Sequence, residues 1–328
     1  MVELFLVIVR VWTKYFIFLI KMNYELKKSF ECDQGAVRAV RYNVDGNYCL
    51  TCGSDRKIKL FNPKNGLMIK TYAGHGDEVN DAVGSCDSGF ILSGSADKSI
   101  IYWDVSTGLP VRRLRTHAGA VSCVKFNEDS SVAISGSRDN TVQCFDIRTR
   151  ALEPIQTLKE AKDCITGLIV TEHKIISSSL DGCIRHYDLR AGELTCDKVG
   201  EPITAVTMTS DEQCVLASCQ DGVIRLIDID GGEALSEYRG HLPKDYKIEC
   251  GLLKNDSHII SGSSFGCVII WDFLEAKQVN TLRINKDGGV IQSLNCHPTN
   301  EDILVANRRQ MQLWSTIDFE IIEDEKMS

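Results

Sequence analysis

Residues 92–104 read LSGSADKSIIYWD, and residues 134–146 read ISGSRDNTVQCFD. In both stretches an Asp stands six positions before an aromatic residue, which a second Asp follows directly. The aromatic position recurs at Phe61, Trp103, Phe145, Tyr187, Trp271 and Trp314, with Ile227 in the fifth place. The successive steps are 42, 42, 42, 40, 44 and 43 residues, and a period of about 40–45 residues is typical of one four-stranded propeller blade.

Blade two shows the repeating unit most completely. Its four short apolar runs are VNDAVGSC (79–86), FILSGS (90–95), SIIYWDV (99–105) and VRRLRT (111–116). Such runs, bounded by Gly, Asp, Asn and Ser, are strand signals, and no segment combines a sustained helical period with capping residues. The sequence therefore predicts an all-β protein with seven blades over residues 22–316, followed by an acidic tail at 317–328.

The last blade is one strand short. After Gly289 the chain offers only three strands, at residues 290–298, 302–307 and 310–314. The segment YELKKSF at residues 24–30 precedes the first complete blade, so we expect it to supply the fourth strand and close the ring. Closure would remove an exposed sheet edge, which is an aggregation hazard.

Residues 1–21, MVELFLVIVRVWTKYFIFLIK, do not fit the repeat. Arg10 and Lys14 interrupt the apolar run that a membrane span needs, and Glu3 lies where a signal peptide carries positive charge. The favoured interpretation is an extension that is lineage-specific or not translated. A membrane anchor is the alternative.

Net charge and cysteine placement indicate which partners and which cellular compartment to expect. The formal net charge of −8 argues against phosphate-driven nucleic-acid binding, so we expect no direct nucleic-acid partner. The 14 cysteines are scattered through strand-like runs, where Cys behaves as a small apolar residue. Cys49 and Cys52 form a single CxxC pair without a second pair at metal spacing. We therefore expect a reduced intracellular protein with no metal, no cofactor and no small-molecule substrate.

The blade-two and blade-three stretches, each preceded by a Gly-His or Thr-His pair, resemble the WD-repeat family. That resemblance implies a buried hydrogen-bond relay of His, Ser or Thr, Asp and Trp in each blade. Carried onto this sequence, the relay residues are His75, Ser93, Asp97 and Trp103, then His117, Ser135 and Asp139, then Asp55, Asp181, Asp221, His241 and Trp271. Phe145, Phe265 and Arg308 depart from the pattern, which predicts weaker relays in the later blades.

A Ser-His-Asp set could also suggest a catalytic triad. The set recurs from blade to blade, whereas an active site is normally built once, so we assign no catalytic residue. Residues 262–266, GSSFG, match the nucleophile-elbow pattern, but they lie in a predicted strand–turn–strand hairpin instead of the strand–turn–helix that the elbow needs. A propeller hydrolase is accordingly the least favoured function.

Four stretches narrow the resemblance to one branch of the family, namely residues 34–63, 72–82, 239–250 and 297–302. They are similar to WD-repeat scaffolds that organise mitogen-activated kinases. The resemblance implies a non-catalytic scaffold, in cytoplasm and nucleus, that assembles components of the extracellular-signal-regulated kinase cascade. It also implies association with spliceosome proteins in pre-mRNA splicing.

Partner contacts are expected on loops, because a rigid scaffold presents its binding residues there. The candidates are the turn residues Arg56, Lys98 and Arg138 and the loop residues Lys244, Asp245 and Tyr246. A second scaffold role, as the substrate receptor of a cullin-type ubiquitin ligase, stays open. It rests on the Asp-x-Arg patterns at residues 146–148 and 188–190.

Overall fold

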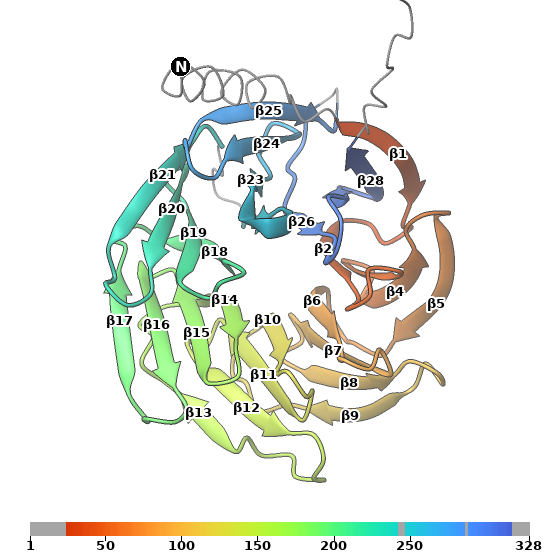
Figure 1. The fold of residues 1–328 in the computed structure, drawn as a ribbon. Coiled ribbons are helices and arrows are strands. Elements are labelled where there is room, and N and C mark those ends of the chain that lie inside the picture. The colour runs from red at the N-terminus through yellow and green to blue at the C-terminus, as the bar shows by residue number, and fades with distance from the viewer. Residues whose placement is uncertain (1–23, 242–246, 286–287, 317–328) are drawn as a thin grey trace, which may run out of the picture.

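The computed structural model describes residues 24–241, 247–285 and 288–316. Within these ranges the regular structure is β, apart from one short 3-10 turn, η1 (Lys254–Asp256). The strands form seven four-stranded antiparallel sheets arranged in a ring (Figure 1). The seven-bladed all-β propeller that the repeat predicted is confirmed.

Six blades are each built from four consecutive strands, which we call a to d from the ring axis outward. Blade one contains β2 (Val37–Tyr42), β3 (Cys49–Gly53), β4 (Lys57–Asn62) and β5 (Leu67–Ala73). Blade two contains β6 (Val79–Gly84), β7 (Phe90–Ser95), β8 (Ile100–Asp104) and β9 (Pro110–Leu114). Blade three contains β10 (Val121–Phe126), β11 (Val132–Ser137), β12 (Val142–Asp146) and β13 (Gln156–Leu158).

The next three blades follow the same order. Blade four contains β14 (Ile165–Val170), β15 (Lys174–Ser179), β16 (Cys183–Asp188) and β17 (Leu194–Lys198). Blade five contains β18 (Ile203–Met208), β19 (Cys214–Cys219), β20 (Val223–Asp228) and β21 (Ala234–Arg239). Blade six contains β22 (Cys250–Leu252), β23 (His258–Ser261), β24 (Cys267–Asp272) and β25 (Gln278–Arg283).

Blade seven combines the two ends of the described chain. Its three inner strands are β26 (Ser293–Cys296), β27 (Ile303–Asn307) and β28 (Gln310–Thr316). The outer strand is β1 (Tyr24–Glu31), which pairs antiparallel with β28. The first and last described strands are therefore neighbours in one sheet.

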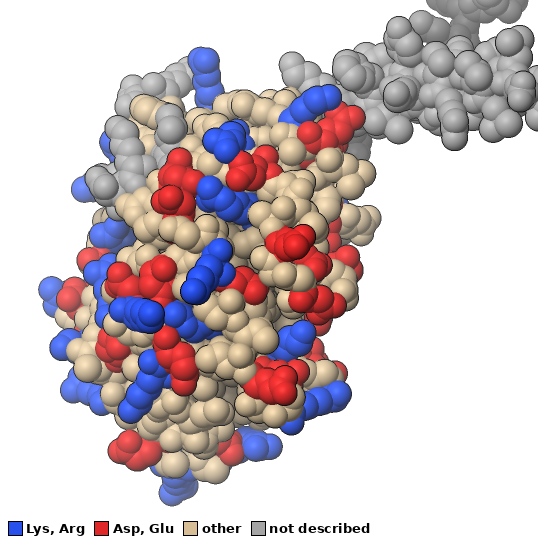
Figure 2. Space-filling model, turned by 90° about the vertical axis from the view of Figure 1, so that its left-hand side faces the viewer, with Lys and Arg blue, Asp and Glu red and all other residues tan. Residues whose placement is uncertain are grey.

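The core lies between neighbouring sheets. The b strand β7 is buried at nearly every position because both of its faces are packed, and it reads as an apolar and small-residue run for that reason. One cluster joins Leu50 and Ile58 of blade one to Ile91 and Trp103 of blade two. The outer strands face solvent, and over blades four and five acidic and basic side chains alternate without a patch of one sign (Figure 2).

Antiparallel order places the connections on two opposite faces of the ring. The b–c turns and the connections between blades lie on the relay face, which includes turns 54–56, 96–98, 138–140, 180–182 and 220–222. The a–b and c–d connections lie on the pocket face, which includes residues 43–48, 127–131, 209–213, 253–257 and 297–302.

Candidate interaction surfaces

The structure brings the four relay residues of blade two together. His75, in the connection that leads into the blade, lies 3.2 Å from Asp97 (Nδ1 to Oδ2) and 2.8 Å from Ser93 (Nε2 to Oγ). Trp103 Nε1 donates to the same Ser93 oxygen at 2.8 Å. Because an ionised carboxylate only accepts, Nδ1 carries the imidazole proton and Nε2 accepts from the Ser93 hydroxyl. The relay thus joins the connection, two central strands and the b–c turn.

Asp97 is the acceptor at the centre of the turn. Its carboxylate accepts the Gly76 amide at 2.6 Å and the Ser99 hydroxyl at 2.6 Å, besides the imidazole of His75. Burial alone raises the pKa of Asp97, but these hydrogen bonds outweigh it and hold the pKa well below its usual range. The charged carboxylate therefore fixes the turn and the connection in one arrangement.

Blade three repeats the relay with one member replaced. His117 lies 2.8 Å from Asp139 (Nδ1 to Oδ2) and 2.9 Å from Ser135 (Nε2 to Oγ). Phe145 fills the Trp position and has no donor for Ser135. Burial raises the pKa of Asp139, but hydrogen bonds from Thr141 and His117 and the charge of His117 outweigh it, lowering the pKa to about 2.

Blades four and five hold the turn aspartate with arginine. Arg185 Nη2 lies 2.6 Å from Asp181 Oδ2, and Arg225 Nη2 lies 2.6 Å from Asp221 Oδ2. The sequence predicted weaker relays in the later blades, and the two ion pairs were not foreseen. The available signal was an Arg four residues after each Asp, at the centre of strand c, in the place of Ile101 in blade two.

Blade one substitutes an amide for the imidazole. Gln34 occupies the connection, where its Oε1 accepts from the Thr51 hydroxyl and its Nε2 donates to the Lys57 carbonyl at 3.0 Å. Asp55 accepts the Lys57 amide at 3.1 Å, so it caps its own turn. The predicted Asp55 lies in the expected turn, while Gln34 was missed because its residue type does not match the His of the motif.

Blade six retains His241 and Trp271, but the two side chains contact different residues and not one shared Ser. His241 Nε2 lies 3.4 Å from Ser218 Oγ of blade five, and Trp271 Nε1 donates to the Arg239 carbonyl at 3.0 Å. Phe265 stands where other blades have the turn Asp, and His241 Nδ1 is buried with no hydrogen-bond partner in the described part of the chain. Burial lowers the pKa of His241 to about 4, so the imidazole is neutral at physiological pH.

The candidate contact residues fall into two groups. Arg56, Lys98 and Arg138 are exposed on the relay face, each next to a turn Asp. Arg56 and Lys98 have φ of 68° and 67°, so the left-handed turn directs them into solvent. The loop candidates at residues 244–246 lie outside the described residues.

An ion-pair network crosses the ring axis, and sequence reasoning did not find it. Arg41 of blade one lies 2.6 Å from Glu249 of blade six and 2.9 Å from Asp81 of blade two. Ser293 of blade seven donates to Glu249 at 2.6 Å. Burial raises the pKa of Glu249, but Arg41 outweighs it and lowers the pKa to about 2. Four blades are thus tied together by residues as far as 252 positions apart, since Arg41 also donates to Ser293 at 3.1 Å.

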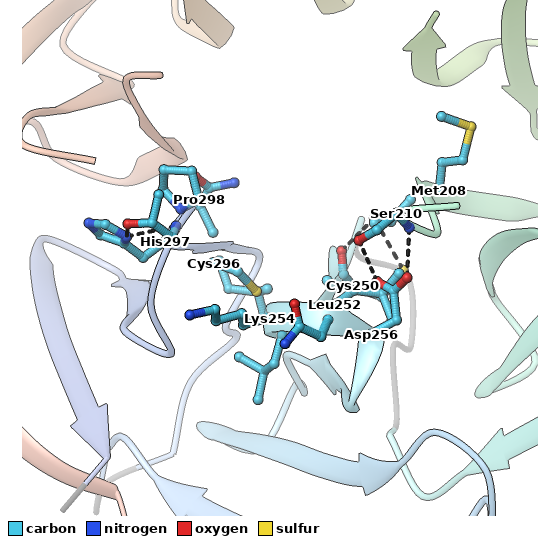
Figure 3. A pocket seen from close by; sticks show the side chains of 16 residues that line it. Met208, Ser210, Cys250, Leu252, Lys254, Asp256, Cys296, His297 and Pro298 are labelled. Carbon is cyan, nitrogen blue, oxygen red and sulfur yellow. Dashed lines mark hydrogen bonds between the residues drawn. The ribbon is translucent and has the colours of Figure 1, made fainter. Parts of the chain in front are cut away.

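A cavity of about 600 Å³ opens on the pocket face between blades five, six and seven (Figure 3). Its lining mixes apolar and thiol-bearing side chains, such as Met208, Leu252 and Cys296, with polar ones, such as Lys254, Asn295 and Thr299. At the rim, Asp256 accepts the Ser210 amide at 2.7 Å and hydroxyl at 3.0 Å, which joins blades five and six. The cavity exists where the inner strands are short, since β22 has only three residues.

The described residues offer no metal site and no membrane-spanning helix. No group of three or more His, Cys, Asp or Glu side chains there is arranged to hold a metal ion. Cys49 and Cys52 are buried free thiols on strand β3, and the GSSFG segment lies in the turn between strands β23 and β24. Among these residues no helix has the length and apolar character that a membrane crossing needs.

Comparison with known proteins identifies the family. The profile of the WD domain, G-beta repeat matches residues 24–62, 66–104 and 108–146. WD repeat domain-containing protein 83 of Rattus norvegicus is 57% identical over 293 residues, which are 89% of this chain and 92% of the relative. The Homo sapiens protein of the same name is 55% identical over 287 residues, covering 88% and 90%.

More distant relatives extend the similarity. The WD repeat domain-containing protein 83 homolog of Dictyostelium discoideum is 35% identical over 301 residues, which are 83% of this chain and 92% of that protein. These two alignments cover between 83% and 92% of the chains compared, so the similarity is not confined to isolated repeats. The chain therefore belongs to the WD-repeat family, in the group formed by WD repeat domain-containing protein 83 and its relatives.

Proposed function

We propose that this chain is a non-catalytic scaffold that assembles components of an extracellular-signal-regulated kinase cascade and also associates with the spliceosome. A general protein-interaction role follows from the WD-repeat propeller. The named partners rest on the resemblance of residues 34–63 and 239–250 to kinase-organising scaffolds. The observation that carries the proposal is 55–57% identity to vertebrate relatives over nearly the entire propeller.

The relay geometry supports a binding role for the relay face. Each turn Asp of blades two and three is fixed by an imidazole and backbone amides, so the neighbouring exposed Lys98 and Arg138 sit on rigid supports. Binding to a rigid loop costs little ordering entropy, which leaves more of the contact energy as affinity. A ring of such turns can hold several partners at once.

The proposal is tested by affinity purification of the full chain with mass spectrometry, from cytoplasmic and nuclear extracts separately. Recovery of mitogen-activated kinases and of spliceosome proteins supports it, and recovery of neither overturns it. The triple variant Arg56→Glu, Lys98→Glu, Arg138→Glu should lose partners of the relay face. The matched control, Arg148→Glu with Arg190→Glu, reverses exposed charges on the pocket face and should retain them.

A second candidate, the substrate receptor of a cullin-type ubiquitin ligase, is favoured by one observation. Arg148 and Arg190 end the Asp-x-Arg patterns of adjacent blades, and both side chains are 70% exposed. They lie on the same face, in the c–d connections of blades three and four. Recovery of cullin adaptors alone, lost in the Arg148→Glu, Arg190→Glu variant, would replace the kinase proposal with this one.

A further inference from the structure

Two cavities along the ring axis form a funnel that begins at the relay face. The outer cavity, about 290 Å³, is lined by Arg38, Glu78, Arg138 and Gln292 among others. The inner cavity, about 110 Å³, is lined by residues that include Arg41, Asp81, Lys125 and Thr166. Lys247 and Glu249 line both cavities, so the two adjoin, and the inner cavity also shares four lining residues with the pocket-face cavity, namely Thr207, Cys250, Leu294 and Asn295. We call this space the funnel.

The carboxylates of the funnel already have cationic partners. Glu78 lies 2.6 Å from Arg38. Asp81 and Glu249 both pair with Arg41, at 2.9 Å and 2.6 Å. Two arginines therefore pair with all three carboxylates that line the funnel.

Three further cations line the same space. Lys247 lies 4.0 Å from Glu249, at the limit of an ion pair. Lys125 and Arg138 have no ion pair with any described residue. The lining thus holds five cationic and three anionic side chains, which leaves two positive charges without a counter-ion. A dianion is the ligand that neutralises this excess.

Lys125 is the most informative of the three. It lies on β10, at the inner cavity, where burial together with the charge of Arg41 lowers its pKa. Lys125 is partly buried, and a partly buried ammonium with no ion pair to a described residue is unfavourable in the free protein; such a group is commonly retained at a ligand site. A bound oxyanion would restore the lost interactions of this ammonium.

We propose that the funnel binds a dianionic oxyanion of the phosphate class, carried on a side chain of a partner protein. The inner cavity has room for a tetrahedral oxyanion, and the outer cavity has room for the side chain and adjoining backbone that carry it. The mouth opens beside the exposed turns of the relay face, which fits a protein partner better than a free ion. The proposal rests on the scaffold function insofar as the partner is a protein.

The test uses three short peptides, acetyl-Gly-X-Gly-amide with X as phosphothreonine, Glu or Thr. Each is titrated calorimetrically into the full chain near physiological ionic strength. We expect the phosphothreonine peptide to bind about 10-fold more tightly than the Glu peptide, because charge-assisted hydrogen bonds to a dianion are stronger, and the Thr peptide not to bind. Inorganic phosphate should compete with the phosphopeptide. Equal affinity for all three peptides, or binding of inorganic phosphate without the phosphopeptide, overturns the proposal.

Two variants test where the phosphopeptide binds. Lys125→Met removes the partly buried charge at nearly constant length, and it should weaken phosphopeptide binding about 10-fold while leaving or raising the melting temperature of the free protein. If Lys125 is instead a structural counter-ion, the same variant lowers the melting temperature and leaves the affinity unchanged, which refutes the proposal. Arg138→Met, at the exposed mouth, should also weaken binding, and Lys64→Met, exposed on the pocket face, should not.

These results are separable from the purification experiment. Failure to recover kinases or splicing proteins, with specific phosphopeptide binding intact, overturns the named partners and retains the funnel site. Recovery of those partners, with no phosphopeptide binding, retains the scaffold function and removes the site.

Discussion

Blades two and three differ from blades four and five in how they hold the same turn aspartate. In blades two and three a His located 22 residues earlier, in the connection between blades, donates to it. In blades four and five an Arg located four residues later, in the same hairpin, donates to it. The imidazole therefore links two parts of the ring, whereas the guanidinium reinforces one hairpin. Equal spacing of the repeat conceals this difference.

Backbone amides of the connection also hold the turn Asp in blades two to four but not in blade five. The connection amides of Gly76, Ala118 and Lys162 donate to the turn Asp of blades two, three and four. In blade five, Asp221 bonds within its hairpin, to the Val223 amide and the Arg225 guanidinium. The comparison predicts that damage to a turn spreads furthest in blade two and least in blade five.

The largest effect is expected for Asp97→Ala. This change leaves His75, Ser99 and the Gly76 amide without their acceptor, and we expect the free energy of unfolding to fall by about 3 kcal/mol. Equilibrium denaturation of the variant measures the loss. Asp87→Ala, which removes an exposed carboxylate from another turn of blade two, is the control and should cost much less. Equal losses for the two variants would contradict the assigned role of Asp97.

The stability of the protein should depend on pH in acid because of Asp139 in blade three. The folded-state pKa of Asp139 is about 2, below the unfolded value, so its contribution is present above the unfolded pKa and is lost as pH falls through the folded pKa. We expect about 2 kcal/mol of stability to disappear between pH about 4 and about 2. Asp139→Asn should flatten the stability profile in that window. An unchanged profile would show that the carboxylate does not stabilise the fold.

Arg225→Met tests the local pair of blade five. The pair is partly exposed, with side-chain exposures of 15% and 25%, so we expect a loss of about 1.5 kcal/mol, between the values for surface and buried pairs. Hydrogen exchange should accelerate within residues 219–225 and remain unchanged in the connection at 199–202. Faster exchange throughout that connection would remove the distinction between the two kinds of blade.

The smallest expected effect is the difference in stability loss between Ser93→Ala and Ser135→Ala. Ser93 accepts from the buried Trp103 indole and bonds His75, whereas Ser135 bonds His117 beside a Phe145 that has no donor. Removing Ser93 should therefore cost about 1 kcal/mol more, because it leaves an additional buried N–H unpaired. Paired denaturation curves measure the difference. A reversed order would mean that the indole hydrogen bond contributes nothing.

Residues close together in sequence account for what could be predicted. The Asp97 turn and the Trp103 strand lie within one hairpin, so their spacing was sufficient to locate both, and the seven blades followed from the repeated spacing. The strand count after Gly289 showed that one strand was missing from blade seven, and β1 occupies that place in the structure.

The remaining features depend on partners that sequence spacing does not identify. Arg185 and Arg225 escaped notice because the family pattern assigns that position no role, although the interval of four residues was visible. Arg41 and Glu249 meet only because the ring brings blades one and six to its axis, across 208 residues of chain. The funnel and the pocket-face cavity likewise require the closed ring before their linings come together.

The pairing of β1 with β28 has a consequence for biosynthesis. Glu31 and Gln310, which are bonded in the finished sheet, are separated by 279 residues, so β1 leaves the ribosome long before its partner exists. Throughout translation it is an open strand edge that could join another nascent chain. Its sequence YELKKSFE alternates few apolar residues with Lys27, Lys28 and two glutamates, a composition that discourages such pairing. The strand β1, which is synthesised first and pairs with the strand synthesised last, is thus one of the most highly charged in the ring.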